Sequence, residues 1–355
     1  MKPKVLIVGR SRYRLPLEPN LRRKFDALAR ELDVRVLASG TGGDETFHLV
    51  APRPPDGPCF WAALPRRVRR ELADFRPDAV LTQSPYEAAA VLAARPDVPV
   101  ILEVHGDWRT ATRLYGSSAR RALAPLVDRI ALSALRRADA VRTISSYTTE
   151  LVRKAGVEPA ATFPAFMDLD PFLGPVAPLP EQPAALFVGV LERYKDVDGL
   201  AAAWRLAAPR VPGVTLRIVG RGGRARVVEG LVQSDWTPAV PNDEIPGVLD
   251  AATVLVLPSR SEGLGRIVVE ALCRGRPVVA TRVGGITDLV RDGENGLLVP
   301  PRDPAALADA LVRVLTDREL AERLAAAARP SVEPWLATPE DYARRTRELV
   351  EQVTR

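Results

Sequence analysis

Short apolar runs alternate along this chain with longer stretches in which apolar positions recur every three or four residues. The short runs lack polar alternation, which is typical of parallel strands buried on both faces, and the longer stretches predict helices. In the first half, strands are predicted at residues 5–8, 34–37, 79–82, 98–104 and 140–144. Helices are predicted between them at residues 21–31, 61–75, 86–94, 118–137 and 147–155.

The second half repeats this alternation of strand and helix. Strands are predicted at residues 185–188, 215–219, 227–232, 254–257, 278–280 and 297–299, and helices at 197–208, 243–251 and 305–315. A proline-rich stretch from Pro159 to Pro183 joins the two halves. A chain of 355 residues is long enough for two ordinary domains, so the pattern predicts an α/β protein with two doubly wound parallel sheets.

Two glutamates, Glu262 and Glu270, flank the start of a predicted helix that follows the strand at residues 254–257. The turn between strand and helix ends in Gly263, Leu264, Gly265 and Arg266. Backbone N–H groups at such a helix start attract an anion. The carboxylates would repel phosphate, so their natural partners are hydroxyl groups. An anion site beside two carboxylates of this kind indicates a sugar nucleotide.

The order of these residues resembles that of the retaining GT-B glycosyltransferases of the group 1 / family 4 type. Their pattern E-G-x-G-x-x-x-x-E-A matches residues 262–271, and G-x-P-V-V-A matches residues 275–280. A G-G-x-x-E loop follows at residues 284–288, with Asp288 in place of the usual glutamate. The resemblance is specific over residues 184–315 and weak over the first 160 residues.

The resemblance implies a GT-B architecture, in which two doubly wound parallel-sheet (Rossmann-like) domains face each other across a cleft. It also implies transfer of a sugar from a nucleoside-diphosphate sugar to a glycan, lipid or small natural product, with retention of anomeric configuration. The expected parts are an acceptor-side domain at residues 1–165, a hinge at 166–183 and a nucleotide-sugar domain at 184–338. A helix at residues 339–355 is expected to pack back on the first domain.

Residues in the loop after the first strand of the second half match the family's diphosphate loop. Gly189 begins this loop, and Lys195 stands at its lysine. Val190 replaces the arginine that the family usually has, so Arg193 or Arg266 is expected to compensate. A solvated lysine at the start of a helix is the alternative for Lys195.

Three further residues match positions of the family. Gly220 lies in an I-V-G-x-G turn that borders the nucleotide, and Trp236 lies where the base is contacted, with core packing as an equal alternative. His105, at the end of a predicted strand, matches a histidine that reaches the donor sugar. The residues implied for catalysis are Glu262, His105 and Lys195. Those implied for donor binding are Gly189, Arg193, Lys195, Gly220, Trp236, Glu262, Gly263, Leu264, Gly265, Arg266 and Glu270.

The few histidines and cysteines limit metal and disulfide chemistry. The chain has two of each, so a histidine-rich metal centre and a disulfide framework are both excluded. We expect no metal and no cofactor apart from the nucleoside-diphosphate sugar that serves as donor substrate. Asp168 and Asp170 form a D-x-D sequence, a metal–diphosphate pattern of another glycosyltransferase fold, but they lie in the linker and are interpreted as part of the hinge.

Excess positive charge is confined to the first half. Residues 1–175 carry 27 Lys and Arg against 20 Asp and Glu, and the remaining residues carry 23 against 24. We expect an acidic acceptor or peripheral binding at an anionic inner membrane face, with a solvated surface as the alternative. The arginines concerned are Arg66, Arg67, Arg69, Arg70, Arg120, Arg121, Arg129, Arg136 and Arg137. No nucleic-acid partner is expected, because this half lacks an aromatic-rich surface.

The apolar run near the N-terminus is too short for a signal peptide, and no run reaches the roughly 18 residues of a membrane span, so a cytoplasmic protein is expected.

Two other functions fit the same fold. A nucleotide-sugar epimerase would need an acid/base pair at C2 of the sugar. A non-catalytic sugar-nucleotide-binding protein would explain Val190 and the absence of an early G-G-x-E loop, whose place the arginine-rich residues 9–14 take. Neither the acceptor nor the oligomeric state follows from the sequence.

Overall fold

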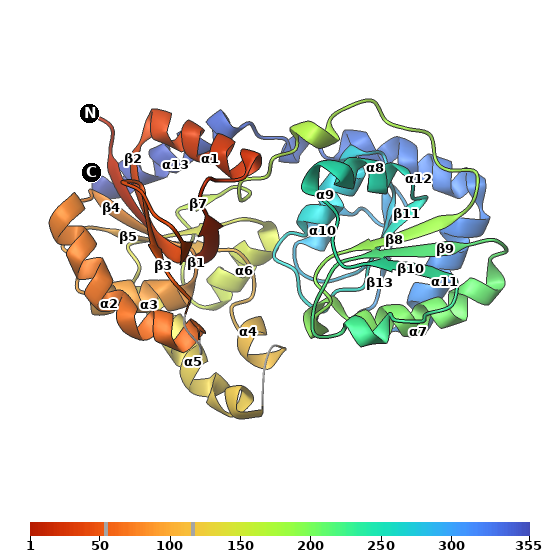
Figure 1. Ribbon diagram of the computed structural model, residues 1–355, viewed down its shortest axis with the longest axis horizontal. Coiled ribbons are helices and arrows are strands. Elements are labelled where there is room, and N and C mark those ends of the chain that lie inside the picture. The colour runs from red at the N-terminus through yellow and green to blue at the C-terminus, as the bar shows by residue number, and fades with distance from the viewer. Residues whose placement is uncertain (53–55, 115–117) are drawn as a thin grey trace. The chain divides into compact units, whose positions relative to one another are not determined.

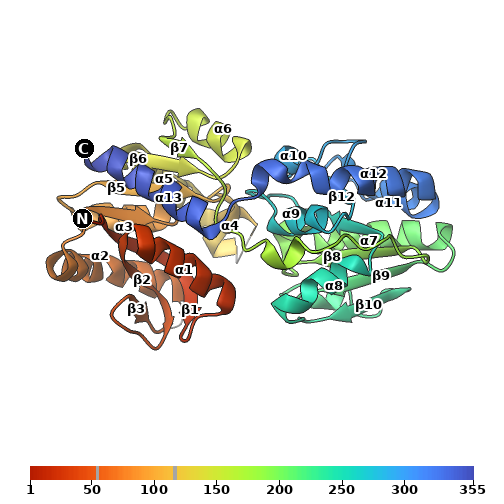
Figure 2. The same cartoon turned by 90° about the horizontal axis from the view of Figure 1, so that it is seen from above.

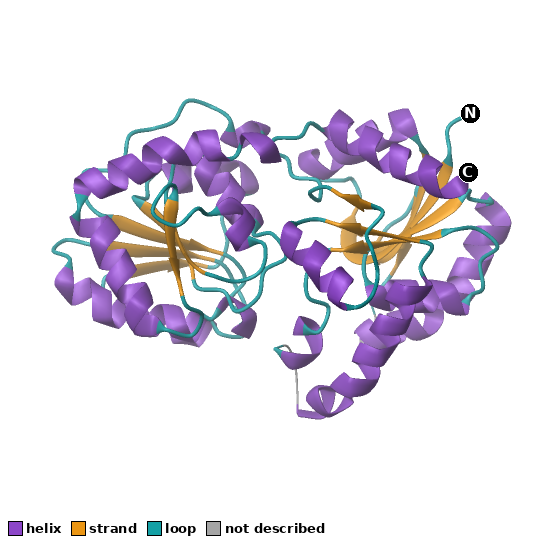
Figure 3. Cartoon of the chain, turned by 180° about the vertical axis from the view of Figure 1, so that it is seen from behind, coloured by secondary structure: helices purple, strands orange, loops and turns teal. Residues whose placement is uncertain are grey.

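Two parallel sheets organise the chain, and each belongs to its own unit (Figure 1). The computed structural model describes residues 1–52, 56–114 and 118–355. The first unit comprises Met1–Asp168 and Ala337–Arg355, and the second comprises Leu169–Leu336. Helices cover both faces of each sheet (Figure 3). Each unit is therefore a doubly wound α/β domain, as predicted.

The sheet of the first unit has the strand order β3-β2-β1-β4-β5-β6-β7. Its strands are β1 (Lys4–Arg14), β2 (Asp33–Thr41), β3 (Phe47–Val50), β4 (Ala79–Thr82), β5 (Val100–Val104), β6 (Ala140–Thr143) and β7 (Ala161–Thr162). Its helices are α1 (Pro19–Glu31), α2 (Asp56–Phe75), α3 (Pro85–Ala93), α4 (Thr110–Arg113), α5 (Ser118–Arg137), α6 (Ser146–Lys154) and α13 (Pro339–Thr354).

Alternate residues of β1 pack on opposite faces of this sheet. Val5 and Ile7 join a core with α1 and α13, whereas Leu6 and Val8 join a core with α2 and α3. Because both faces are covered there, residues 5–8 of the strand are apolar without alternation. Helix α13 lies beside α1 in both views (Figures 1 and 2) and starts with a capping box at Thr338.

The sheet of the second unit has the order β10-β9-β8-β11-β12-β13. Its strands are β8 (Ala184–Val188), β9 (Thr215–Val219), β10 (Ser234–Thr237), β11 (Val254–Leu257), β12 (Val278–Thr281) and β13 (Gly296–Val299). Its helices are α7 (Val197–Ala207), α8 (Ile245–Asp250), α9 (Arg266–Cys273), α10 (Ile286–Leu289), α11 (Pro304–Thr316) and α12 (Arg318–Ser331). Helix α7 packs beside α11, and α9 beside α12.

The strand predicted at residues 227–232 is wrong. A 3-10 turn covers Ala225–Val227, Gly230 has a φ of +70°, and the strand begins only at Ser234. Val228 and Leu231 are buried three residues apart, a spacing that a turn satisfies and a strand does not. The short edge strands β3 and β7 and the helix α12 are further elements that the apolar pattern did not predict.

Most of the stretch predicted as hinge, residues 166–183, is attached to the second unit by three arginines. Arg329 donates to the carbonyls of residues 173 and 174, Arg276 to those of 177 and 178, and Arg318 to those of 179 and 180. Asp168 is paired with Arg23 in the first unit. The division between the units therefore falls between residues 168 and 169, and the chain returns to the first unit at residue 337.

Two glycines hold the loop after β12 against the loop after β11. A Cβ atom on Gly284 would lie 1.9 Å from the carbonyl oxygen of Glu262, and one on Gly285 would lie 2.2 Å from that of Gly263. The N–H of Gly285 donates to the Glu262 carbonyl at 3.2 Å. This backbone contact leaves no room for any side chain, so glycine is required at both positions.

Replacing Gly284 by alanine should therefore separate these loops. Gly284 has a φ of +53°, so Gly284→Ala combines left-handed strain of about 1–2 kcal/mol with overpacking of about 1–3 kcal/mol. Gly293→Ala is the matched control, because Gly293 has a φ of +79° but open space around its Cα. Urea unfolding should show the larger loss of unfolding free energy for Gly284→Ala. Equal losses in the two variants would mean that the loop contact is not required.

Candidate active site

The loops that follow β8, β9, β11 and β12 lie along one edge of the second sheet. All neighbouring strands of this sheet run parallel, so their carboxyl ends share that edge, which is where open α/β sheets bind ligands. All the predicted donor-binding residues come from these loops, from the first turns of α9 or from the neighbouring strand β10. His105 lies at the carboxyl end of β5 in the first unit.

The loops after β8 and β9 touch through their backbones. A Cβ atom on Gly220 would lie 1.8 Å from the carbonyl oxygen of Gly189, and the N–H of Leu191 donates to the carbonyl of Arg221 at 2.9 Å. Trp236 on β10 donates its indole Nε1–H to the Gly220 carbonyl at 2.8 Å. The half-buried indole is thus fixed beside the glycine turn, so this tryptophan supports the loop.

Lys195 and Glu262 form an ion pair at this edge. The Nζ of Lys195 lies 2.5 Å from Oε1 of Glu262, and the hydroxyl of Ser259 donates to the same oxygen at 2.7 Å. Each charged side chain is only 10% exposed. The sequence assigned these residues separately, the lysine to a diphosphate and the glutamate to a sugar, but the structure places them in direct contact. The alternative of a solvated lysine is wrong.

A second ion pair fixes the turn that carries Lys195. Asp196 follows the 3-10 turn Arg193–Lys195, has a φ of +51° and is buried. Arg260, in the loop after β11, donates its Nη2 to Oδ1 of Asp196 at 2.5 Å and its backbone N–H to the carbonyl of Tyr194 at 2.7 Å. Sequence reasoning missed this pair. An aspartate at the start of a helix was the only available signal, and its side chain makes no capping bond there.

Helix α9 begins directly after Gly265, whose φ is +91°. Glu270, one turn into the helix, is 6% exposed, and Arg266 Nε donates to its Oε1 at 2.5 Å. Burial raises the pKa of Glu270, and the Arg266 guanidinium acts in the opposite direction. A hydroxyl group that donates to this carboxylate would help to replace the hydration that burial has removed.

The position of the missing family arginine is occupied by an exposed aliphatic side chain. Val190 is 44% exposed in the loop after β8. Of the two arginines expected to compensate, Arg266 donates to Glu270, whereas Arg193 is solvent-exposed on the turn that carries Lys195. Arg266 is therefore engaged with a carboxylate, and Arg193 is exposed to solvent.

Carboxylates with metal-site spacing do not occur in the described part of the chain. Residues 1–52, 56–114 and 118–355 contain no group of three or more His, Cys, Asp and Glu that could hold a metal ion. In the D-x-D sequence, Asp168 is buried against Arg23, and Asp170 begins a 3-10 turn. The Asp168 carboxylate is therefore already paired with an arginine.

Comparison with known proteins matches both units. The family described as Glycosyltransferase Family 4 matches residues 21–170, and the family described as Glycosyl transferases group 1 matches residues 182–317. An alpha-D-kanosaminyltransferase from Streptomyces kanamyceticus is 27% identical over 89% of this chain and 87% of its own length. A D-inositol 3-phosphate glycosyltransferase from Corynebacterium urealyticum is 35% identical, but the match covers 37% of this chain and 34% of that protein.

Solved structures extend the similarity over the whole chain. Sucrose-phosphate synthase from Thermosynechococcus elongatus superposes with a TM-score of 0.79 at 21% identity, covering 99% of both chains. HepE from Anabaena, solved with UDP and glucose, gives a TM-score of 0.71 at 19% identity, covering 98% of this chain and 100% of its own. These similarities show the fold. With each half matched by its own family, the chain belongs to the GT-B glycosyltransferases of the group 1 / family 4 type.

Proposed function

We propose that this protein transfers a glycosyl group from a nucleoside-diphosphate sugar to a hydroxyl-bearing acceptor, with retention of anomeric configuration. The observation that carries the proposal is the juxtaposition of the Lys195–Glu262 pair with the start of helix α9 and the buried Glu270, all at one sheet edge. A cation and a helix N-terminus suit a diphosphate, and the carboxylates suit the hydroxyl groups of sugar and ribose. HepE, which has the same fold, was solved with UDP-glucose.

The site must stabilise the charges that develop as the nucleoside diphosphate departs. Negative charge develops on the phosphate while the sugar gains oxocarbenium character. Lys195, Arg193 and the N–H groups at the start of α9 are preorganised donors for that negative charge. In a front-face reaction the departing phosphate takes the acceptor proton, so no covalent nucleophile and no general-base histidine are needed.

Because Lys195 and Glu262 are already paired, binding of the donor requires both side chains to change partners in a defined order. A diphosphate oxygen competes with Oε1 of Glu262 for the Lys195 ammonium. As the lysine turns to the phosphate, the carboxylate becomes available to accept hydroxyl groups of the donor hexose. The two charges compensate each other before the donor binds, so neither is left unpaired in a largely buried site.

Titration of UDP, GDP and ADP by calorimetry, followed by turnover of the matching nucleotide sugars, tests the proposal. Release of nucleoside diphosphate that depends on an acceptor supports glycosyl transfer. Change of the donor sugar without an acceptor would establish an epimerase instead. Tight nucleotide binding without turnover over a broad acceptor panel would establish a non-catalytic binding protein, for which the exposed Val190 is the supporting observation.

Glu262 and Glu270 should have different roles. We expect Glu270→Gln to weaken binding of the nucleoside diphosphate itself by about tenfold or more, because a charge-assisted hydrogen bond to ribose contributes roughly 1.5–3 kcal/mol. Glu262→Gln should spare nucleoside diphosphate binding and lower turnover, because its contact is with the transferred sugar. Calorimetry and steady-state rates distinguish them. Loss of nucleotide affinity in Glu262→Gln, with affinity kept in Glu270→Gln, would reverse the assignment.

Turnover should not depend on a divalent metal ion. Lys195 and the start of α9 neutralise the leaving group in this mechanism, so rates should be unchanged in EDTA. Adding Mg²⁺ or Mn²⁺ back to the chelated enzyme serves as the control. A rate abolished by EDTA and rescued by either ion would contradict the mechanism.

We also propose that the protein acts at the cytoplasmic face of an anionic membrane, which the first unit contacts through helix α5. None of the helices in the described part of the chain combines the length and apolarity needed to cross a bilayer. Leu123, Leu126 and Ile130 are 55%, 57% and 44% exposed on α5, at spacings that place them on one face. These three residues form an apolar ridge along α5. The exposed Arg129 borders this ridge, and the exposed Arg137, two turns after Ile130, extends it.

Charge complementarity supports an anionic bilayer as the partner of the ridge. Within residues 118–137 the sequence holds five arginines and one acid, Asp128, which is paired with Arg113. The side chains of two of these arginines, Arg120 and Arg121, lie outside the described residues. An amphipathic helix with a basic border binds anionic lipid surfaces, and each basic residue contributes about 1 kcal/mol near such a surface.

Liposome flotation at low salt tests this contact. The wild-type protein should float with vesicles containing phosphatidylserine, and replacing Leu123, Leu126 and Ile130 by serine should reduce binding by at least about tenfold. Leu206→Ser is the matched control, because Leu206 is 50% exposed in the second unit. Equal non-binding to anionic and neutral vesicles would rule out the membrane, and loss of a dimer in the triple variant would identify a second copy as the partner.

A further inference from the structure

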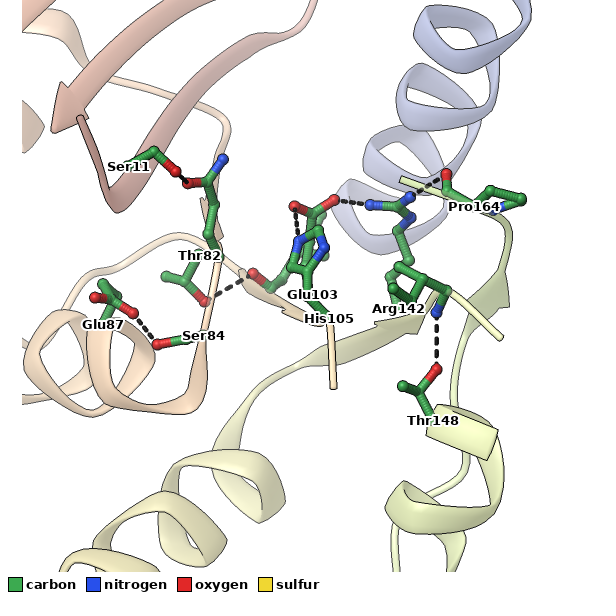
Figure 4. A network of polar contacts seen from close by, with 12 residues as sticks. Ser11, Thr82, Ser84, Glu87, Glu103, His105, Arg142, Thr148 and Pro164 are labelled. Carbon is green, nitrogen blue, oxygen red and sulfur yellow. Dashed lines mark hydrogen bonds and ion pairs between the residues drawn. The ribbon is translucent and has the colours of Figure 1, made fainter. Parts of the chain in front are cut away.

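A buried ion pair lies behind the predicted sugar-contacting histidine (Figure 4). Glu103 on β5 and Arg142 on β6 are partners in the register of the sheet and are bonded through Oε1 and Nη1. They are 2% and 0% exposed. The other carboxylate oxygen of Glu103 faces Nε2 of His105 at 3.2 Å. Glu103 therefore bridges Arg142 and His105.

Arg142 also binds the segment that leads out of the first unit. Its Nη2 donates to the carbonyls of Phe163 and Pro164 at 3.0 and 2.7 Å, and its guanidinium lies 3.9 Å from the centre of the Phe163 ring. The ring of Tyr342, near the start of α13, lies 5.5 Å from the same guanidinium. The pair is thus held by the two segments through which the chain leaves the first unit and returns to it.

The charge state of Glu103 decides which atom carries the proton in its contact with His105. Burial would raise the pKa of Glu103, but the adjacent Arg142 guanidinium and the bond from His105 outweigh it and lower the pKa to about 2. The carboxylate is then ionised at neutral pH and can only accept hydrogen bonds. The histidine nitrogen that faces it must be the donor.

We propose that Glu103 is a positioning residue that holds the neutral His105 ring as its Nε2–H tautomer. In this tautomer Nδ1 has a lone pair and can accept a hydrogen bond from a donor-sugar hydroxyl. The His105 side chain is 38% exposed at the carboxyl end of β5, so a ligand can approach the ring there. A role for this tautomer in turnover rests on the proposed function. The assignment of the tautomer rests only on the contact between Glu103 and His105.

The composition of the chain makes this inference directly measurable. His48 and His105 are the only histidines in the sequence. His48 contacts Glu71 through Nδ1 at 2.7 Å, so its expected tautomer is the opposite one. Long-range ¹H–¹⁵N correlation spectra of the intact protein without ligand, at an alkaline pH where imidazoles are neutral, should show one Nδ1–H and one Nε2–H ring.

Two isosteric variants assign the rings and test the cause. Glu103→Gln should shift the Nε2–H ring to the Nδ1–H tautomer and leave the other ring unchanged. Arg142 can only donate, so it keeps the amide oxygen, and the amide NH₂ group is left facing Nε2 of His105. Glu71→Gln should do the reverse. A His105 ring that is Nδ1–H in the wild-type protein, or that stays purely Nε2–H in Glu103→Gln, would overturn the proposal. If Glu103→Gln does not fold, Glu71→Gln alone still assigns the two rings of the wild-type spectrum and so decides the tautomer of His105.

Steady-state kinetics distinguish positioning from a purely structural role. Glu103→Gln should lower kcat by about tenfold, the effect expected from one misdirected charge-assisted bond, while nucleoside diphosphate affinity and the thermal midpoint of the second unit stay unchanged. An altered tautomer with unaltered kcat would show that His105 does not contact the sugar. Absence of any turnover in the wild-type protein would refute the proposed function and leave the tautomer result intact.

Discussion

The contact between Lys195 and Glu262 is the interaction on which the candidate site depends. Two opposite charges, each only 10% exposed, lie 2.5 Å apart on loops that follow different strands. Removing both from water costs free energy, and such pairs often contribute little to net stability. In the proposed function their value is chemical, because both groups lie at the sheet edge where the donor would bind. The backbone around the pair is tightly constrained.

That constraint comes from glycines and from a second charge pair. Gly284 and Gly285 bring the loop after β12 against the backbone of Glu262, and Arg260 with Asp196 fixes the turn that presents Lys195. In the first unit, the Glu103–Arg142 pair orients His105, as the Arg260–Asp196 pair fixes the turn that presents Lys195. In each unit a charged or polar side chain at the sheet edge is thus held by a buried charged partner. In the proposed reaction, such fixed groups lower the reorganisation needed.

The sequence predicted most of the fold because strands buried on both faces are uninterrupted apolar runs, as in Val5–Val8 and residues 254–257. It was wrong at residues 227–232, where buried Val228 and Leu231 are three residues apart and belong to a turn. It missed β3 and β7, which are edge strands of only four and two residues. The glycine spacing located the loops of the site, but not its contacts. Lys195 and Glu262 are 67 residues apart, and no local pattern predicts that they pair rather than act separately.

The most direct measurement of the central claim is the anomeric configuration of the transferred sugar. Proton NMR of the product, recorded early in turnover of a nucleoside-diphosphate α-sugar with an accepted acceptor, reports this configuration through the anomeric coupling constant. The account predicts an α-linked product, because donors around Lys195 and the start of α9 hold the departing phosphate on the face that the acceptor attacks. A β-linked product would contradict it, since inversion requires attack from the opposite face and a base that these residues do not supply.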